Sequence, residues 1–369
     1  MPLISVESEK HTKGGRSMGN SSFWNDTEED EIYTLTEQDV LGVLSSTRRV
    51  LEQGEHVWLV TDNIEHISNS WIHEHQNTHE QQISSLPPWD NTYHFHDSTE
   101  RTVNWLLLLD ALNFCFWAEK GRERWRISYK EETLNGYWAE AAALKRAVEE
   151  GMPLWDAAYL STVSEDTVAS IFRPIEGSDP IPLMEQRLLN IREVGRVLQE
   201  KYDGQFAQTI KQANGNALTL VQLLAHDFSS FNDIVSYRNH EVRFFKRAQI
   251  CVADVYSAFG GKQWGAFSDL NKLTIFADYK LPQILRHYGI LVYQPTLAEA
   301  IDAQELLEPG SEEEVEIRAG TIWACELLRR AMQQQGYSMN ALEIDQKLWS
   351  LSQHTEHMRP YHRVRTQFY

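Results

Sequence analysis

The stretch EVRFFKRAQICVADVYSAFGGKQWGAFSDLNKLTIFADYKLPQILRHY, residues 241–288, decides how this chain folds. Its first half predicts a helix, because apolar residues recur there at helical spacing. The pattern leaves Lys246, Gln249 and Ala253 together on the opposite side of that helix. Glycines at 260 and 261 are expected to end it. The apolar positions are Phe244, Phe245, Ala248, Cys251, Val252, Val255 and Phe259.

A second helix start is predicted near Asp278, where the apolar run 270–277 ends. Pro282 supports this prediction, because proline suits the first turn of a helix and disfavours helix in the residue before it. A carboxylate in an apolar pocket can stabilise an oxocarbenium-like centre or activate water, and a nearby lysine such as Lys246 keeps it ionised. The alternative is a helix cap together with a surface lysine. The residue pattern leaves both readings open.

The composition excludes some functions. The chain has 369 residues and a net charge of −19, which argues against a large nucleic-acid interface. Cys115, Cys251 and Cys325 lie in apolar helical runs without metal-binding spacing, so we expect buried free thiols in a reducing compartment. The N-terminus lacks the apolar core of a secretion signal. We therefore expect a soluble, cytoplasmic protein. We also expect it to act as a monomer, although the sequence carries no signal for the oligomeric state.

The remaining pattern is mainly α, with two or three short strands. We predict a mobile extension over residues 1–32 and one helical domain over 33–369. The apolar helix 101–120 should be central. The predicted strands are 56–60 and 125–129, the latter followed by a turn signal at Asn135-Gly136. Further helices are predicted from residue 36 to 54 and over 64–82, 137–150, 154–160, 165–172, 182–202, 205–213, 217–225, 297–307, 312–335 and 341–351.

Two further polar groups are candidate binding residues. Asp110 and Asn113 share a face of the helix 101–120, where either a ligand or an internal hydrogen-bond network could satisfy them. Asp227 and Phe228 lie in a predicted loop that extends to Asp233 and suits recognition of a base. Helix capping by either aspartate is equally consistent with the sequence. The aromatic residues Phe114, Phe116 and Trp117 are expected in the core.

Metal and cofactor signals are weak. Two histidine clusters, His73/His75/His79 and His94/His96, lack an acidic third ligand at a diagnostic spacing. No phosphate loop, GxGxxG motif after a strand, GxSxG or CxxC motif occurs. We expect neither a metal nor a cofactor. A single phosphate group could still be bound by Lys246, Arg247 or the terminal arginines at 363 and 365.

Six long motifs together resemble the queuosine salvage protein family over residues 38–369. They are ERTVNWLLLLDALNFCFW, LNGYWAEAAAL, PIPLMEQRLLNIREVG, FFKRAQICVADVY, FADYKLPQILRHYGIL and PGSEEEVEIRAGTIWA. The resemblance implies a fold similar to helix-hairpin-helix DNA glycosylases. It also implies an N-glycosidase that hydrolyses queuosine 5′-phosphate and releases queuine for insertion into transfer RNA.

The resemblance assigns roles to residues of this chain. It implies that Asp278 and Lys246 are catalytic, and that Asp110, Asn113 and Phe114 lie near the base. It makes Tyr279 and the loop of Asp227 and Phe228 candidate pocket walls. Two other classes stay open at this point, a nucleic-acid base glycosylase and a non-catalytic helical interaction protein. Salt-sensitive binding of DNA or RNA would favour the first, and an inert pocket the second.

Overall fold

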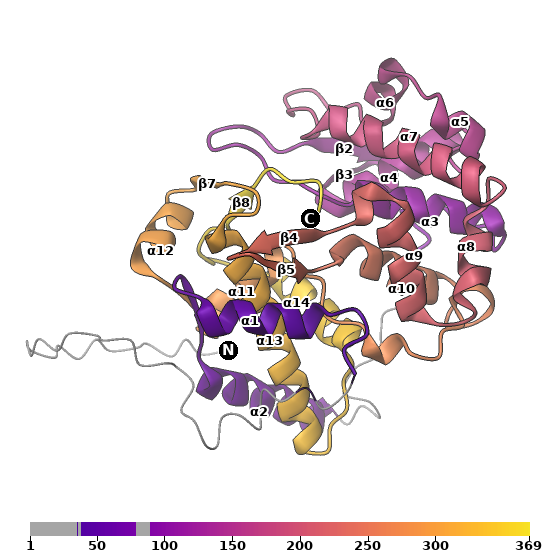
Figure 1. Ribbon diagram of the computed structural model, residues 1–369. Helices are drawn as coiled ribbons and strands as arrows, with labels where there is room; N and C mark the ends of the chain where they lie inside the picture. The colour runs from indigo at the N-terminus through magenta and orange to yellow at the C-terminus, as the bar shows by residue number, and fades with distance from the viewer. Residues whose placement is uncertain (1–34, 36–37, 79–88) are drawn as a thin grey trace, which may run out of the picture. The chain divides into compact units, whose positions relative to one another are not determined.

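The computed structural model describes residues 35, 38–78 and 89–369. The predicted extension over residues 1–32 therefore lies outside the described residues. The unit 35–369 is mainly α, as the sequence predicted, with helices α1 to α14 (Figure 1). Within the described ranges it has eight short strands, more than the two or three expected, and they pair into four two-stranded sheets. The similarity to DNA glycosylases stays a prediction.

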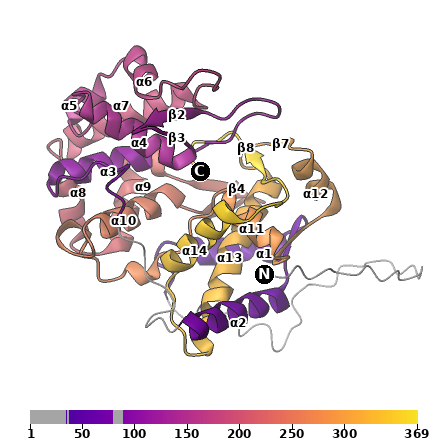
Figure 2. The ribbon, with the colours of Figure 1, turned by 180° about the vertical axis from the view of Figure 1, so that it is seen from behind.

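One group of helices comes from the middle of the chain and surrounds the apolar helix α3 (Figures 1 and 2). α3 packs against α4, α7, α8 and α10. It is apolar nearly all round and all its residues from Thr102 onward are buried, which gives this group its core. The members are α3 (Glu100–Leu112), α4 (Gly136–Glu149), α5 (Ala157–Ser161), α6 (Glu165–Ile171), α7 (Met184–Lys201), α8 (Phe206–Ala213), α9 (Ala217–Asp227) and α10 (Lys246–Ala258).

The second group joins both ends of the described chain around the long helix α13. α13 begins at a Ser311 cap followed by three glutamates, which favour a helix N-terminus. α14 begins with a full capping box between Asn340 and Glu343. The members are α1 (Val43–Gln53), α2 (Thr61–Thr78), α11 (Lys280–His287), α12 (Pro295–Asp302), α13 (Glu312–Gln334) and α14 (Ala341–His354).

Two of the four short sheets join segments that are distant in the sequence, and the other two are local hairpins. The antiparallel pair β1–β6 joins the start of the described chain to residues 291–293, and the parallel pair β7–β8 joins residues 306–307 to the C-terminal segment. The pairs β2–β3 and β4–β5 are hairpins. The strands are β1 (Val57–Leu59), β2 (Arg126–Tyr129), β3 (Glu132–Asn135), β4 (Ile234–Tyr237), β5 (His240–Arg243), β6 (Leu291–Tyr293), β7 (Leu306–Leu307) and β8 (Arg363–Val364).

The predicted helix beginning before residue 246 is wrong at its start. Residues 240–243 instead form β5, joined to β4 by a tight turn at residues 238–239 whose φ angles are 44° and 66°. Phe245 has a φ of 51°, so α10 begins only at Lys246. The side of α10 opposite its apolar residues is buried too, because Lys246, Gln249 and Ala253 are each at most 5% exposed. The predicted stop at 260–261 is confirmed, since α10 ends at Ala258.

Other predicted boundaries are also corrected. The helix predicted over 297–307 ends at Asp302, since Gln304 has a φ of 62° and residues 306–307 form β7. α1 starts at Val43, where the carboxylate of Asp39 accepts hydrogen bonds from the amide of Gly42, just before the helix, and from that of Ser45, in its first turn. α3 stops at Leu112 rather than 120, and the φ of 48° at Cys115 cannot continue a right-handed helix. The turn after β2 lies at residues 130–131, whereas Asn135 leads directly into α4.

The three cysteines are buried free thiols, as the sequence predicted. A search of the described residues finds no helix with the length and apolarity to cross a membrane.

Candidate active site

A pocket of roughly 230 Å³ brings Asp278 and Lys246 together. It lies where the end of α3, the β2–β3 hairpin, the start of α10, the segment before α11, and α14 meet. Its lining residues are Asn113, Phe114, Phe116, Arg124, Thr133, Leu134, Asn135, Gly136, Tyr137, Trp138, Lys246, Asp278, Tyr279, Lys280, Trp349, Gln353, Tyr361 and Tyr369. A wider, open groove of roughly 1420 Å³ between the start of α3 and α5 contains neither Asp278 nor Lys246.

Asp278 is both a helix cap and a pocket carboxylate. Its Oδ1 accepts hydrogen bonds from the amides of Lys280 at 2.7 Å and Leu281 at 2.9 Å, which begin α11. Its Oδ2 has no hydrogen-bond partner among the residues that the structure describes. Burial raises the pKa of Asp278, and the nearby Lys246 ammonium only partly offsets this rise. One oxygen is therefore committed to the fold, and the other is available to a ligand.

Lys246 is not the surface lysine of the alternative reading. Its side chain is inside the protein, with 5% of the residue exposed. The Nζ atom donates to the carbonyl oxygen of Asn113 at 3.2 Å, and the amide donates to Oδ2 of Asp233 at 3.2 Å. Burial lowers the pKa of Lys246, whereas Asp278 opposes that change. The ammonium thus stands between the end of α3 and the pocket carboxylate.

Side chains from distant helices hold the C-terminal end of α3. The last carbonyl groups of a helix have no partner within the helix, and cations suit them. Arg187 donates to the carbonyl oxygens of Leu112 and Phe114, both at 2.5 Å. Arg247 and Asn190 donate to the carbonyl oxygen of residue 111, which directly precedes Leu112. These contacts end the helix and turn residues 113 and 114 into the pocket.

Three carboxyl groups, those of Asp110, Glu140 and Asp254, interact with Lys246 but do not line the pocket. Burial raises the pKa of Asp254 to about 7 and that of Glu140 to about 8. The pKa of Asp110 is raised well above its usual range, first by burial and then by Asp254. Neither carboxyl oxygen of Asp110 has a partner in good hydrogen-bond geometry among the described residues. Asp110, which the sequence suggested as a binding residue, is fully buried and does not reach the pocket surface.

Aromatic side chains form much of the pocket wall. Trp138 of α4 and Trp349 of α14 meet edge to face, with ring centroids 6.1 Å apart. Tyr279 and Tyr361 form a tilted pair at 4.9 Å. Phe114 lies under the guanidinium of Arg187, 4.3 Å from its ring centroid. Flat apolar walls of this kind suit a planar aromatic ligand.

Two further cations line the pocket without a carboxylate partner. Arg124 donates from Nη2 to the hydroxyl of Tyr361 at 3.2 Å, and Lys280 donates to Oε1 of Gln283 at 3.2 Å. Neither forms an ion pair with a carboxylate in the described part of the chain. Burial and then the charge of Arg124 lower the pKa of Lys280, so the two cations lie close enough to repel. An anion bound between them would relieve that repulsion.

The other predicted residues lie in two places. Asn113, Phe114 and Tyr279 line the pocket. Asp227 and Phe228 do not, and they form the end of α9, where the Asp227 carboxylate contacts Lys201 and the hydroxyl of Tyr202. Phe228 is fully buried.

Sequence reasoning missed the pocket residues Arg124, Trp138, Lys280 and Trp349. Lys280 alone carried a local signal, because it follows Asp278 by two residues. Of the basic residues proposed for a phosphate group, Arg247 is directed at carbonyl oxygens and Arg365 pairs with Glu119.

His94 has partners within the protein and is not a free metal ligand. His94 contacts the carbonyl oxygen of Asp90 and the hydroxyl of Tyr137, and burial lowers the pKa of His94 to about 4. A search of the described residues finds one group with the spacing of a metal site, made of His56, Glu312 and Glu316. The Glu316 carboxylate of this group already accepts hydrogen bonds from the backbone amides of residues 55–57. These contacts satisfy it without an ion.

The pocket therefore combines one carboxylate with a free oxygen, aromatic walls and unpaired cations. Such a carboxylate can stabilise positive charge on a sugar ring. The walls suit a base, and the cations suit a phosphate group. Together they match the parts of a nucleotide.

Comparisons with known proteins identify a family and several relatives of this chain. A family model described as queuosine salvage protein matches residues 93–369. A relative from Sphaerobacter thermophilus is 46% identical over 332 residues, which cover 90% of this chain and 98% of the relative. A relative from Mus musculus is 38% identical over 73% of this chain and 82% of its own length, and one from Schizosaccharomyces pombe is 32% identical over 82% and 91%. All three are named queuosine 5′-phosphate N-glycosylase/hydrolase.

Proposed function

This chain belongs to the queuosine salvage protein family, and we propose that it hydrolyses the N-glycosidic bond of queuosine 5′-phosphate. The products are the base queuine, which is salvaged into transfer RNA, and ribose 5-phosphate. The observation that carries the proposal is the divided role of Asp278. Its Oδ1 caps α11, while its Oδ2 has no partner among the described residues and belongs to a pocket with aromatic walls.

The chemistry follows from the charge that builds up on the sugar. As the bond from C1′ to the base nitrogen breaks, the ribose ring becomes oxocarbenium-like, and the Asp278 carboxylate stabilises this cation. A water oxygen then bonds to C1′ and gives its proton to Asp278. The departing base nitrogen takes up a proton from solvent, and Asp278 later returns its proton to solvent, so the proton balance closes and the carboxylate is regenerated. A carboxylate whose pKa is raised by burial suits this proton uptake.

Lys246 supports the ionised form of Asp278. Its buried ammonium has a favourable electrostatic interaction with that carboxylate. Its own position is fixed by the hydrogen bond from Nζ to the carbonyl oxygen of Asn113. We assign the base to the side of the pocket formed by Asn113, Phe114 and the two tryptophans, 138 and 349, because stacking there leaves the sugar near Asp278.

The 5′-phosphate is assigned to Arg124 and Lys280. Both line the pocket and lack carboxylate partners in the described ranges, so a phosphate group gains charge-assisted hydrogen bonds without breaking an ion pair. Lys280 follows Asp278 by two residues. One nucleotide can therefore place its phosphate at Lys280 and its reacting carbon at Asp278. The hydroxyl of Tyr361, bonded to Arg124 at 3.2 Å, extends the same subsite.

The test is incubation of the purified protein with queuosine 5′-phosphate, followed by chromatography for free queuine. One arm contains EDTA, because the proposed reaction needs neither a metal nor a cofactor. Release of queuine in both arms is the expected result. Absence of queuine in every arm would contradict the proposal, and release abolished by EDTA would contradict its metal-free form.

The proposal extends to partners and location. We infer that the protein acts on a free nucleotide in the cytoplasm, does not bind duplex nucleic acid and works as a monomer. The net charge of −19 disfavours a polyanion, and buried free thiols suit a reducing compartment. Gel filtration and a salt-dependent binding assay with duplex DNA and RNA test these points.

A further inference from the structure

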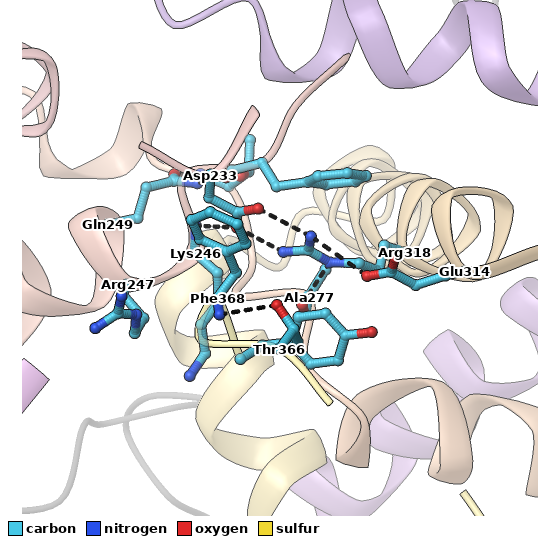
Figure 3. Close-up of polar contacts among 12 residues, drawn as sticks. Asp233, Lys246, Arg247, Gln249, Ala277, Glu314, Arg318, Thr366 and Phe368 are labelled. Atoms are coloured by element: carbon cyan, nitrogen blue, oxygen red, sulfur yellow. Dashed lines mark hydrogen bonds and ion pairs between the residues drawn. The ribbon is translucent and has the colours of Figure 1, made fainter. Parts of the chain in front are cut away.

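Arg318 of α13 connects the two candidate catalytic residues without reaching the pocket itself. Its guanidinium, on a residue 2% exposed, forms two hydrogen bonds to Asp233, at 3.0 Å to Oδ1 and 2.6 Å to Oδ2. Its Nε donates to the carbonyl oxygen of Ala277 at 3.2 Å. Figure 3 shows the guanidinium between these two partners. Arg318 is not among the residues that line the pocket.

Each partner leads directly to a candidate catalytic residue. Asp233 accepts the amide of Lys246 at its Oδ2, at 3.2 Å, and the amides of Phe244 and Phe245 at its carbonyl oxygen. These bonds hold the turn that starts α10, where Phe245 has a φ of 51°. Ala277 directly precedes Asp278. A continuous set of bonds therefore runs from the backbone of Lys246 through Asp233 and Arg318 to the residue before Asp278.

The guanidinium also supports a wall of the pocket. It lies between two rings, 3.9 Å from the centroid of Phe244 and 4.5 Å from that of Tyr369. Tyr369 lines the pocket. Glu314, one turn earlier on α13, lies 4.0 Å from Nη1 and adds a second carboxylate. One side chain thus contacts three parts of the site's framework.

A buried ion pair of this kind contributes little net stability, because removing both charges from water offsets their attraction. The planar guanidinium of Arg318 instead fixes the distances and angles between its hydrogen-bond partners, and a lysine ammonium cannot reproduce this geometry. We propose that Arg318 is a positioning residue that sets the separation of Lys246 and Asp278, through Asp233 on one side and Ala277 on the other. The proposal rests on the assigned hydrolysis of queuosine 5′-phosphate for its kinetic consequence only.

The test compares Arg318→Lys with a matched control, Arg286→Lys. Arg286 of α11 also forms a forked pair, with Asp302 at 2.7 and 3.1 Å, and lies 5.0 Å from the ring centroid of Tyr293. That pair contacts neither Lys246 nor Asp278. We expect Arg318→Lys to lower kcat at least tenfold with KM within about twofold of the unmodified protein. The control should keep both constants within about twofold.

A second kinetic readout distinguishes positioning from general loosening. Lys246 lowers the pKa of Asp278, so moving the ammonium away should shift the acid limb of the kcat profile to higher pH. Lys280 and Asp345, the other charged groups that act on Asp278, are unchanged in the variant. The Arg286→Lys profile should match that of the unmodified protein.

Amide hydrogen exchange gives a readout that does not need activity. In Arg318→Lys, exchange should become faster in residues 244–248 and 277–281 together, and in neither segment of the control. If the unmodified protein releases no queuine, the proposed function fails, while the exchange result still decides the positioning role. Unchanged exchange in both segments of Arg318→Lys, or kinetics equal to those of the control, would overturn the proposed positioning role of Arg318. Should Arg318→Lys fail to fold, Asp233→Asn provides the same comparison.

Discussion

Replacing Asp278 with asparagine separates the two roles of this side chain. The Oδ1 atom of asparagine can still accept the amides of Lys280 and Leu281, which Asp278 accepts at 2.7 and 2.9 Å. The amide nitrogen then takes the place of Oδ2, so the pocket loses its negative charge and gains a donor. The helix cap survives and the carboxylate does not.

The expected loss of activity can be worked from charge alone. Two unit charges about 3.5 Å apart, at an effective dielectric constant of about 20, attract each other by about 5 kcal/mol. The developing charge on the sugar is smaller than one unit, and each 1.4 kcal/mol corresponds to a factor of about ten. Asp278→Asn should therefore lower kcat by about three orders of magnitude.

Stability should change little in the same variant. The cap loses its charge-assisted strength, about 1 kcal/mol, but burial no longer opposes an ionised group at a site where the pKa is raised. We expect a thermal midpoint within about 2 °C of the unmodified protein. Asp278→Ala should lose the same activity and about 1 kcal/mol of stability as well, because the cap disappears.

The assay is single-turnover release of queuine from queuosine 5′-phosphate, with thermal unfolding followed by circular dichroism. Asp278→Asn retaining more than a tenth of the rate would refute the catalytic role. A large fall in its thermal midpoint would refute the separation of the two oxygens. The two measurements fail independently, so each part of the reasoning is tested.

Three other changes follow from the same structure. Lys280→Ala or Arg124→Ala should raise KM for the nucleotide at least tenfold and leave KM for the free nucleoside within about twofold. The control Arg122→Ala lies outside the pocket and should change neither constant in initial-rate assays. Burial raises the pKa of Glu140 to about 8. Between about pH 5 and 8 the folded state therefore keeps a proton that the unfolded chain has lost, so the free energy of unfolding should fall as pH rises through this range. Glu140→Gln should flatten that fall, which urea midpoints at both pH values measure, and an unchanged slope would contradict it. Gly195→Ala should destabilise the fold by about 2 kcal/mol or more in thermal unfolding, since its Cβ would lie 2.3 Å from a backbone nitrogen of α5.

The helices could largely be predicted because their signals are local. Periodicity and caps such as Ser311 and Asn340 lie within a few residues of the helices that they start. The end of α3 could not be predicted, since the apolar run continues past residue 112. The side chains that end it, Arg187, Asn190 and Arg247, come from α7 and α10, more than seventy positions later. Tertiary contacts here override local propensity.

The candidate site could be predicted only where a local signal marks a residue. Asp278 stands out because it precedes a lysine and a proline at a helix start. Trp138 and Trp349 carry no such signal, because a tryptophan in a helix is usually core and only the meeting of α4 with α14 exposes these two to one pocket. The buried state of Lys246 likewise depends on the carbonyl group at the end of α3.

The distribution of charge explains how an acidic protein can take an anionic substrate. The chain carries a net charge of −19, yet the side chains that line the pocket include three cations, Arg124, Lys246 and Lys280, and one carboxylate, Asp278. A polynucleotide places many phosphates against the surface, and most of them meet repulsion. A mononucleotide brings a single phosphate, which can enter the local positive region. We therefore expect the same charges to favour a free nucleotide over a nucleic acid because of the number of phosphates, before any contact with the base.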